Sequence, residues 1–186
     1  MMPNYRSILP MLLFVSMTGC IAPKPPPPPG TPDPKRSPYW KEGVSNGDPS
    51  VVIRLGEQRA YFYRGTDVVG ETNVSTGRKG YETPPGSYKI IQKNENHVSN
   101  LYGDLYDEYG DLVEKNVDLE KDKVPEDGVF IGSPMPYYMR FHRGYGMHAG
   151  RVPSYRASHG CVRLPRTMAR RFFENVEIGT PVVVEP

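Results

Sequence analysis

Residues that could carry out chemistry gather near the C-terminal end of the 186-residue chain. His148, His159 and Cys161 lie within fourteen residues, and Cys161 is one of only two cysteines. A thiol with imidazole groups nearby is typical of a nucleophile with a proton carrier, the usual route to covalent acyl transfer. The sequence therefore points to Cys161 as the reactive residue, and spacing alone leaves the choice of histidine open.

The residues beside Cys161 supply further groups that acyl transfer needs. If residues 158–164 are extended, His159, Cys161 and Arg163 project from one face, because alternate side chains of a strand share a face. Gly160 leaves the backbone accessible, so nearby N–H groups could receive a developing oxyanion, and one such donor contributes about 2.7–4 kcal/mol. Arg163 can hold a carboxylate through two parallel hydrogen bonds. Together these groups indicate acyl transfer on a substrate that bears a carboxylate.

Two other interpretations of the cluster are weaker. Cys161 with His142, His148 and His159 could bind zinc. However, the segment has no Cys-x-x-Cys or His-Glu-x-x-His signature, and acidic ligand candidates are distant in the sequence. A buried structural thiol is the other alternative, although a neighbouring glycine and arginine would be unusual in a core. We therefore expect no metal and no cofactor.

The composition of the chain limits its class. With 37% hydrophobic and 24% charged residues, it fits one globular domain with extensions. A net charge of +2, with basic and acidic residues mixed along the chain, gives no reason to expect a nucleic-acid partner. Cys20 ends a hydrophobic leader whereas Cys161 lies in the chemical cluster, so we expect no disulfide between them.

The N-terminus has the features of a secretion signal. Arg6 precedes an apolar run at residues 8–15, which is too short to span a bilayer as a helix of about 20 residues. The run ends in Met-Thr-Gly-Cys, which resembles a bacterial lipobox, so residues 1–20 are predicted to be a lipoprotein signal peptide with Cys20 as the lipidated residue. Ile21 then favours the outer membrane. The alternative is an ordinary cleaved signal.

Residues 21–48 are predicted to form a proline-rich linker. Proline at this density favours an extended polyproline conformation over helix or central strand. At about 3.1 Å per residue, residues 23–34 would reach about 37 Å. Such a stalk would hold a catalytic domain away from a membrane; a ligand for a proline-binding domain is the alternative.

The remaining residues, 49–186, are predicted to form a mainly β domain. Short β-branched and aromatic runs separated by turn residues are typical of an antiparallel sandwich or barrel. Residues 83–86 are interpreted as a rigid connection and not a binding loop. The expected strands cover residues 51–55, 60–63, 68–75, 87–93, 128–131, 139–143 and 182–184.

One helix is expected after the cysteine motif. Pro165 fits its first turn, where a missing N–H costs nothing. Met168, Phe172, Phe173 and Val176 then fall on one helical face, which we expect to end near Gly179.

Residues 94–127 form a long insert between predicted strands. Tyrosines alternate with acidic residues, with a few aliphatic residues between them. Such inserts are either solvated excursions with a small core of their own or lids over a substrate. His97 lies at the start of the insert, and no spacing connects it to the cysteine cluster, so we expect a surface or structural role.

A family resemblance covers residues 50–185. The stretch 147–164, MHAGRVPSYRASHGCVRL, closely resembles the active-site motif of the YkuD-type L,D-transpeptidases, and the upstream strands are similar to the opening region of that family. In papain-like and NlpC/P60 cysteine peptidases the cysteine precedes the histidine, whereas His148 precedes Cys161. The fold that the resemblance implies is the family's β-sandwich.

The resemblance also assigns roles to residues of the motif. It implies Cys161 as the nucleophile and His148 as the proton carrier, oriented by the backbone carbonyl of Ala149. The gap between the two catalytic residues is short for the family, which implies a tight connecting loop. The supporting roles are substrate or cysteine positioning by Arg163, loop support by Ser158, and shaping of the oxyanion site by His159 and Gly160.

The reaction that the resemblance implies takes place on peptidoglycan stem peptides. Cys161 would attack the carbonyl of the third stem residue, expel the terminal D-Ala, and pass the acyl group to a second amine in a 3→3 cross-link or a wall-protein attachment. The alternatives are an L,D-carboxypeptidase, with water as acceptor, and a non-catalytic peptidoglycan-binding lipoprotein. The implied location is the periplasmic side of the cell envelope, with the membrane as a partner through the lipid anchor.

Overall fold

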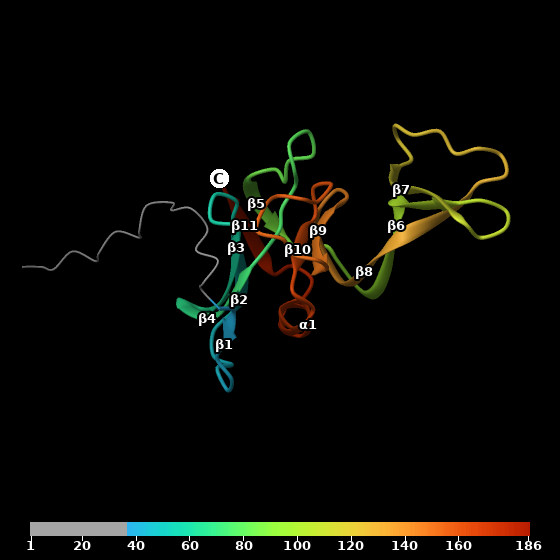
Figure 1. Ribbon diagram of the computed structural model, residues 1–186. Helices are drawn as coiled ribbons and strands as arrows, with labels where there is room; N and C mark the ends of the chain where they lie inside the picture. The colour runs from blue at the N-terminus through green and yellow to red at the C-terminus, as the bar shows by residue number, and fades with distance from the viewer. Residues whose placement is uncertain (1–36) are drawn as a thin grey trace, which may run out of the picture.

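The computed structural model describes residues 37–186, which form two β-sheets and one helix (Figure 1). The predicted signal peptide and most of the predicted stalk lie outside the described residues. The strands are β1 Tyr39–Trp40, β2 Pro49–Arg54, β3 Arg59–Arg64, β4 Asp67–Asn73, β5 Gly86–Lys89, β6 Gln92–Tyr106, β7 Leu112–Asp118, β8 Val129–His142, β9 Tyr145–Ala149, β10 Val162–Leu164 and β11 Pro181–Glu185, and the helix is α1 Arg166–Asn175.

The two sheets form the expected sandwich, but both are mixed. One sheet has the strand order β1-β4-β3-β2-β11-β5, with β11 parallel to β2. The other has the order β10-β9-β8-β6-β7, with β10 parallel to β9. The prediction of a mainly β fold is confirmed, whereas the purely antiparallel arrangement was wrong, because two parallel pairings join segments far apart in the sequence.

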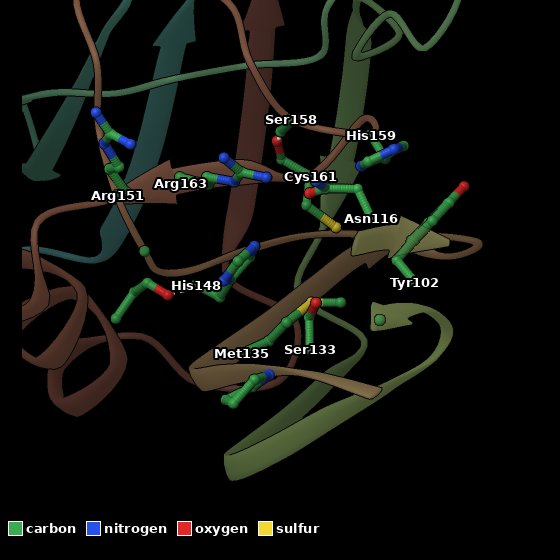
Figure 2. Close-up of a pocket in the computed structure, with 14 residues that line it drawn as sticks. Tyr102, Asn116, Ser133, Met135, His148, Arg151, Ser158, His159, Cys161 and Arg163 are labelled. Carbon is green, nitrogen blue, oxygen red and sulfur yellow. Dashed lines mark hydrogen bonds between the residues drawn. The ribbon is translucent and has the colours of Figure 1, made fainter. Parts of the chain in front are cut away.

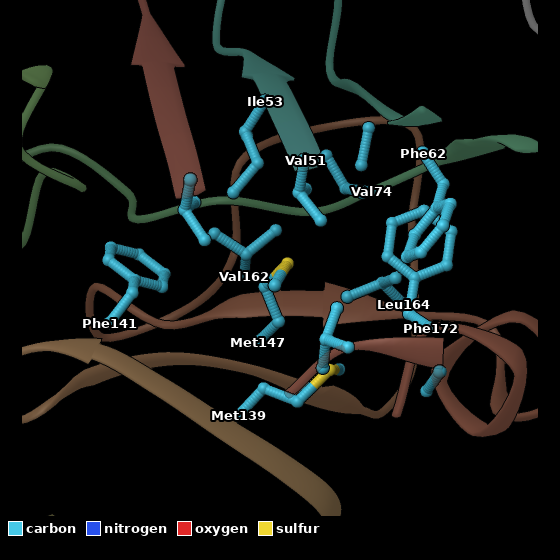
Figure 3. Packing of buried hydrophobic residues seen from close by; sticks show 14 of the residues in the cluster. Val51, Ile53, Phe62, Val74, Met139, Phe141, Met147, Val162, Leu164 and Phe172 are labelled. Carbon is cyan, nitrogen blue, oxygen red and sulfur yellow. The ribbon is translucent and has the colours of Figure 1, made fainter. Parts of the chain in front are cut away.

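The hydrophobic core fills the space between the sheets and beneath the helix (Figure 3). Val51 and Ile53 of β2 face Met147 of β9 and Val162 of β10, and all four are completely buried. In β2 and β10 the buried residues alternate with less buried neighbours, as expected when one face of a strand packs on a core, whereas in β9 the neighbours of Met147 are buried too. The strands on either side of the cysteine motif are therefore fixed by the core.

The segment before residue 49 contributes to the domain. Trp40 of β1 pairs with Gly70 of β4, and its ring lies 5.1 Å from Phe62 and 6.0 Å from Phe172, measured between ring centroids. The folded part of the chain therefore includes residues that we assigned to the linker. Burying the indole against two aromatic rings stabilises this addition to the sheet edge.

Helix α1 differs from the prediction at both ends. Pro165 occupies the N-cap position and not the first turn, and the helix ends at Asn175, before the predicted end near Gly179. Met168 and Phe172 are buried as the helical pattern predicts. The early end follows from Val176, whose backbone is extended.

Strand β8 replaces the two short strands predicted at residues 128–131 and 139–143. Pro134 and Pro136 lie inside it. Proline is tolerated in a strand that lacks a neighbour on one side, because no ladder hydrogen bond is lost there. Strand β9 pairs with β8 only from Met139 onward, so the proline-containing part of β8 has a single partner, β6.

The predicted insert is mostly strand. Strands β6 and β7, with the first part of β8, form a sheet extension that projects from the sandwich (Figure 1). We call residues 92–131 the hairpin extension. Leu105 and Val117 are buried within it, in agreement with a small local core. The strand predicted at residues 87–93 is in fact divided between β5 and β6, which belong to different sheets.

Within residues 37–186, no helix is both long enough and apolar enough to cross a bilayer.

Candidate active site

The Cys161 segment is held by backbone bonds that cross from the first sheet to the second. Beyond β4, the Ser75 N–H donates to the Arg163 carbonyl and the Arg163 N–H donates to the Ser75 carbonyl, both at 3.0 Å. Ser158 likewise donates its N–H to the Thr76 carbonyl at 3.1 Å and accepts from the Arg78 N–H at 3.0 Å. Backbone bonds on both sides therefore fix the position of the cysteine between them.

The loop before Cys161 is closed by Ser158 and Thr83. The Ser158 hydroxyl accepts the Gly160 N–H at 3.1 Å and donates to the Cys161 carbonyl. The Thr83 hydroxyl donates to the Gly160 carbonyl at 2.7 Å. Gly160 has a φ of +112°, and a Cβ there would lie 2.6 Å from a ring carbon of Tyr145. Glycine is therefore required at this position.

The left-handed Gly160 corrects the prediction that residues 158–164 are extended throughout. Only Val162–Leu164 form a strand, because Gly160 turns the chain before it. His159, Cys161 and Arg163 nevertheless border one cavity, as the alternation predicts. The N–H of Gly160 is bound to Ser158 and so is not available to an oxyanion.

His148 lies on β9 directly opposite Arg163 of β10 and is almost completely buried. Its Nδ1 atom is 2.9 Å from the Ala149 carbonyl oxygen, the contact that the family resemblance implies. Because a carbonyl can only accept, Nδ1 carries the proton and Nε2 is an unprotonated base. Burial lowers the pKa of His148 to about 4; the bond to Ala149 opposes this shift and the charge of Arg163 adds to it. The imidazole is therefore neutral at pH 7.

His159 is oriented by a different set of contacts. Nη2 of Arg78 is 2.7 Å from its Nε2 atom, which must accept that bond. Its ring stacks on Tyr102, with centroids 4.5 Å apart, and meets the edge of Tyr81 at 4.8 Å. Burial and then the charges of Arg78 and Arg163 lower the pKa of His159 to about 4. The acceptor nitrogen of His159 is thus already bound to an arginine.

The Cys161 thiol, which is partly exposed, has one partner in the turn between β8 and β9 and a second near the start of β9. Its sulfur lies 3.6 Å from the Gly144 carbonyl oxygen, and the Gly146 N–H points to it. Burial raises the pKa of the Cys161 thiol, while the Gly146 N–H and then the charges of Arg163 and Arg140 oppose the rise. The thiol is therefore protonated in the resting protein at neutral pH.

Two cavities meet at Cys161. The first, of about 290 Å³, contains the side chains of His148, Arg163 and Asn116 around the sulfur (Figure 2). The second, of about 360 Å³, lies toward the hairpin extension and the β8–β9 turn. Residues common to both are Tyr102, Met135, His159 and Cys161. The sulfur can therefore be approached from two sides.

Several residues of the cavities carry no signal in the sequence. Tyr102, Asn116 and Ser133 come from strands β6, β7 and β8, which the sequence pattern did not resolve. His97, for which we expected a surface or structural role, stacks on Tyr138 with ring centroids 4.2 Å apart and borders the second cavity. Strand pairing between distant segments brings these residues to the cysteine, and no spacing along the chain reveals that.

His142, named above only in the weaker zinc interpretation, lies near two aromatic rings. Its ring centroid is 4.8 Å from that of Tyr88 and 6.1 Å from that of Tyr145. Across residues 37–186, no three or more His, Cys, Asp or Glu side chains come together as a potential metal site.

Comparisons with known proteins agree on one family. A family model described as the L,D-transpeptidase catalytic domain (YkuD) matches residues 48–184. "Probable L,D-transpeptidase YbiS" of Escherichia coli (strain K12) is 28% identical over 137 residues, which is 71% of this chain and 43% of YbiS. "Probable L,D-transpeptidase 3" of Mycobacterium tuberculosis is 27% identical over 156 residues, covering 77% of this chain and 47% of that protein.

The fold is found among solved structures as well. An L,D-transpeptidase of Enterococcus faecium matches with a TM-score of 0.54 and 26% identity, covering 75% of this chain and 50% of that one. The chain spans less than half the length of the curated relatives described above.

Proposed function

The chain belongs to the YkuD family of L,D-transpeptidase catalytic domains, and we propose that it is a cysteine L,D-transpeptidase acting on peptidoglycan stem peptides. The observation that carries the proposal is that Cys161, directly before β10, and His148, on the adjacent strand β9, border one cavity. A nucleophile and a base oriented by a third group are the parts that covalent acyl transfer requires.

His148 is the better base of the two histidines near the sulfur. Its Nδ1–H is held by Ala149, so the free nitrogen is the one able to accept a proton. His159 instead uses its acceptor nitrogen for Arg78. We therefore assign proton transfer to His148, and a supporting role beside the oxyanion site to His159.

In the first half-reaction a C–S bond replaces a C–N bond, and one proton moves from the thiol to the leaving amine. Both the thiol and His148 are neutral at rest, so the S–H proton passes to Nε2 as sulfur attacks the carbonyl of the third stem residue. The C–S bond forms, the C–N bond to D-Ala breaks, and the imidazolium returns its proton to the leaving amine. A thioester on Cys161 remains.

The second half-reaction reverses these transfers with a new amine. The incoming amine loses a proton to His148 Nε2 as it attacks the thioester, and the departing sulfur takes the proton back. The second cavity beside Cys161 supports an acceptor larger than water, which favours transpeptidation over the L,D-carboxypeptidase reaction. Attachment of wall proteins uses the same chemistry with another amine.

Backbone donors and Arg163 are proposed to bind the charges of the substrate. Because the Gly160 N–H is bound to Ser158, we assign the Cys161 N–H as the oxyanion donor, with Gly160 shaping the turn. Arg163 borders the first cavity, which has no acidic residue in its lining, and no acidic side chain within residues 37–186 forms a salt bridge with it. A donor carboxylate could therefore pair with this guanidinium.

The proposed location is the periplasmic side of the bacterial cell envelope. Cys20 would carry the lipid anchor in the outer membrane, and the proline-rich stalk would let the domain reach the wall. Labelling with radioactive palmitate tests the anchor: the label should appear on the wild type and be absent from Cys20→Ala, and label retained on the variant would contradict it.

Product analysis tests the activity. Disaccharide tetrapeptides incubated with the protein should release D-Ala and yield cross-linked dimers, detected by mass spectrometry, with no reaction for Cys161→Ala. Tripeptides without dimers would identify the carboxypeptidase. Release of D-Ala by Cys161→Ala would refute the proposed nucleophile, and no reaction by any form would favour the non-catalytic binding protein.

A further inference from the structure

The Gly144 carbonyl accepts hydrogen bonds from two side chains. The Tyr138 hydroxyl donates to it at 2.9 Å, and the Cys161 sulfur lies 3.6 Å from the same oxygen. A carbonyl oxygen has two lone pairs and can accept both bonds. Tyr138 is only 2% exposed, and it borders the second cavity beside Gly144.

The ring of Tyr138 also contacts the other partner of the sulfur. A Cβ added at Gly146 would lie 2.4 Å from Cε2 of Tyr138, so the ring packs directly against this glycine. The Gly146 N–H is the group that points to the Cys161 sulfur. One side chain therefore holds both backbone groups that touch the thiol.

The turn that carries Gly144 and leads into Gly146 of β9 is strained. His142 pairs with Tyr145, so Arg143 and Gly144 form a two-residue turn between β8 and β9. Arg143 has a φ of 44°, a left-handed conformation that residues other than glycine rarely adopt. Such a conformation persists only when surrounding contacts fix it, and the Tyr138 hydroxyl is one such contact.

We propose that Tyr138 is a positioning residue for the nucleophile, because it fixes the β8–β9 turn so that Cys161 has a partner in each protonation state. The Gly144 carbonyl accepts from the thiol, and the Gly146 N–H donates to the thiolate. This inference rests on the proposed role of Cys161 as the nucleophile. Without the Tyr138 hydroxyl the turn relaxes, the thiolate loses part of its stabilisation, and the thiol becomes less reactive.

Other charged or titratable groups near the sulfur come from every neighbouring strand. Arg140 on β8 lies 5.9 Å from the Tyr138 ring, and Arg163 on β10 adds a second positive charge. His148 on β9 and His97 on β6 are the nearby imidazoles, and His159 and Tyr102 border both cavities. All of these side chains are kept in Tyr138→Phe, and of them Arg140 loses a hydrogen bond to the Tyr138 hydroxyl. Burial raises the pKa of Tyr138 to about 12, so its hydroxyl is a donor over the whole test range.

Alkylation of Cys161 by iodoacetamide, followed by mass spectrometry from pH 5 to pH 10, tests the proposal without a peptidoglycan substrate. Tyr138→Phe should react about 3–10-fold more slowly at pH 7, the effect of losing one net hydrogen bond. The midpoint of its rate–pH curve should shift upward. The matched control is Tyr137→Phe, because Tyr137 packs on Phe173 and borders neither cavity; its curve should match the wild type.

The proposal is overturned if the rate–pH curve of Tyr138→Phe coincides with that of Tyr137→Phe. This holds even if the melting temperature of Tyr138→Phe is lower. If Tyr138→Phe does not fold, the double variant Arg143→Gly/Tyr138→Phe is compared with the single variant Arg143→Gly. Glycine adopts the positive φ without strain, and the slower alkylation is still expected. Normal alkylation of the wild type without D-Ala release would refute the proposed function and leave this inference standing.

Discussion

The two parts of the second sheet differ in how firmly they are held. Around Cys161, Met147, Val162 and Leu164 are completely buried against the first sheet, and backbone bonds join the two sheets beside the cysteine. In the hairpin extension, by contrast, Val113 is 60% exposed and Ile131 is 53% exposed. The proposed catalytic groups thus lie on a tightly packed part of the fold, whereas part of the cavity wall lies on a less tightly packed extension.

Few contacts connect the extension to the cysteine loop. The Tyr81 hydroxyl donates to the buried carboxylate of Asp118 at 3.0 Å, and Lys121 lies over the Tyr81 ring at 3.7 Å. Tyr102 stacks on His159 from the same side. Substitutions in the tightly packed part should therefore reduce kcat, and substitutions in the extension should act mainly on KM.

The largest effect is expected at His148. His148→Ala should lower kcat for D-Ala release about 10²–10⁴-fold, the usual contribution of a positioned proton carrier. His159→Gln, on the side of the extension, should cost less than about 10-fold, because its acceptor nitrogen is bound to Arg78. Steady-state kinetics of both variants would measure this difference, and the reverse order would move the base to His159.

A smaller but substantial loss is expected from Gly160→Ala. The added methyl group meets Tyr145 and the φ of +112° is unfavourable to alanine, so kcat should fall about 10–100-fold. Gly110→Ala is the matched control, because Gly110 has a φ of +85° in the extension with no atom within 4 Å of the added carbon. Its kcat should stay within about 2-fold of the wild type. An equal loss of kcat in both variants would mean that the cysteine loop is no more sensitive than the hairpin extension.

Thr83 should show an intermediate effect, mostly on stability. Thr83→Val keeps the shape of the side chain but leaves the buried Gly77 N–H and Gly160 carbonyl without their partner. The free energy of unfolding should fall by about 2 kcal/mol, and kcat should fall several-fold as the loop loosens. Urea denaturation and kinetics measure both quantities. Thr83→Ser retains the hydroxyl and should restore most of each; no recovery would mean that the hydroxyl is not what holds the loop.

The smallest change in kcat is expected at Tyr81. Tyr81→Phe removes the bond to Asp118 but keeps the ring beside His159, so the extension should open more often while the cysteine loop stays in place. We expect KM for the donor to rise about 2–5-fold, with faster amide hydrogen exchange in β6 and β7. A fall in kcat as large as that of Thr83→Val would show that the two regions are not separable.

The sequence predicts local features of this site better than distant ones. The contact of His148 with Ala149 joins neighbouring residues, so the motif that carries it could be recognised directly. Gly144 and Tyr138 reach the sulfur only through the strained β8–β9 turn. The length of β8 could not be predicted, because Pro134 and Pro136 are compatible with a strand only where one side has no neighbour. The sequence does not reveal that β8 lacks a neighbour there.

In the fold, too, local features could be predicted from the sequence and distant pairings could not. Alternating apolar residues identified the strands that face the core, whereas the pairing of β11 with β2 closes a sheet between the two ends of the domain. Trp40 joins the first sheet because Phe62 and Phe172 provide an aromatic surface for it. Its flanking prolines and polar residues resemble those of the linker, so its place in the fold was not predictable.

The central claim is that Cys161 is acylated by the donor stem while His148 transfers the proton. Rapid acid quenching of wild-type protein mixed with a tetrapeptide donor, followed by intact-mass and peptide mass spectrometry, tests it most directly. We expect a tripeptide acyl group on Cys161, formed together with one equivalent of D-Ala, and at least 100-fold slower acylation for His148→Ala. An acyl group on another residue, or D-Ala release by Cys161→Ala, would contradict it.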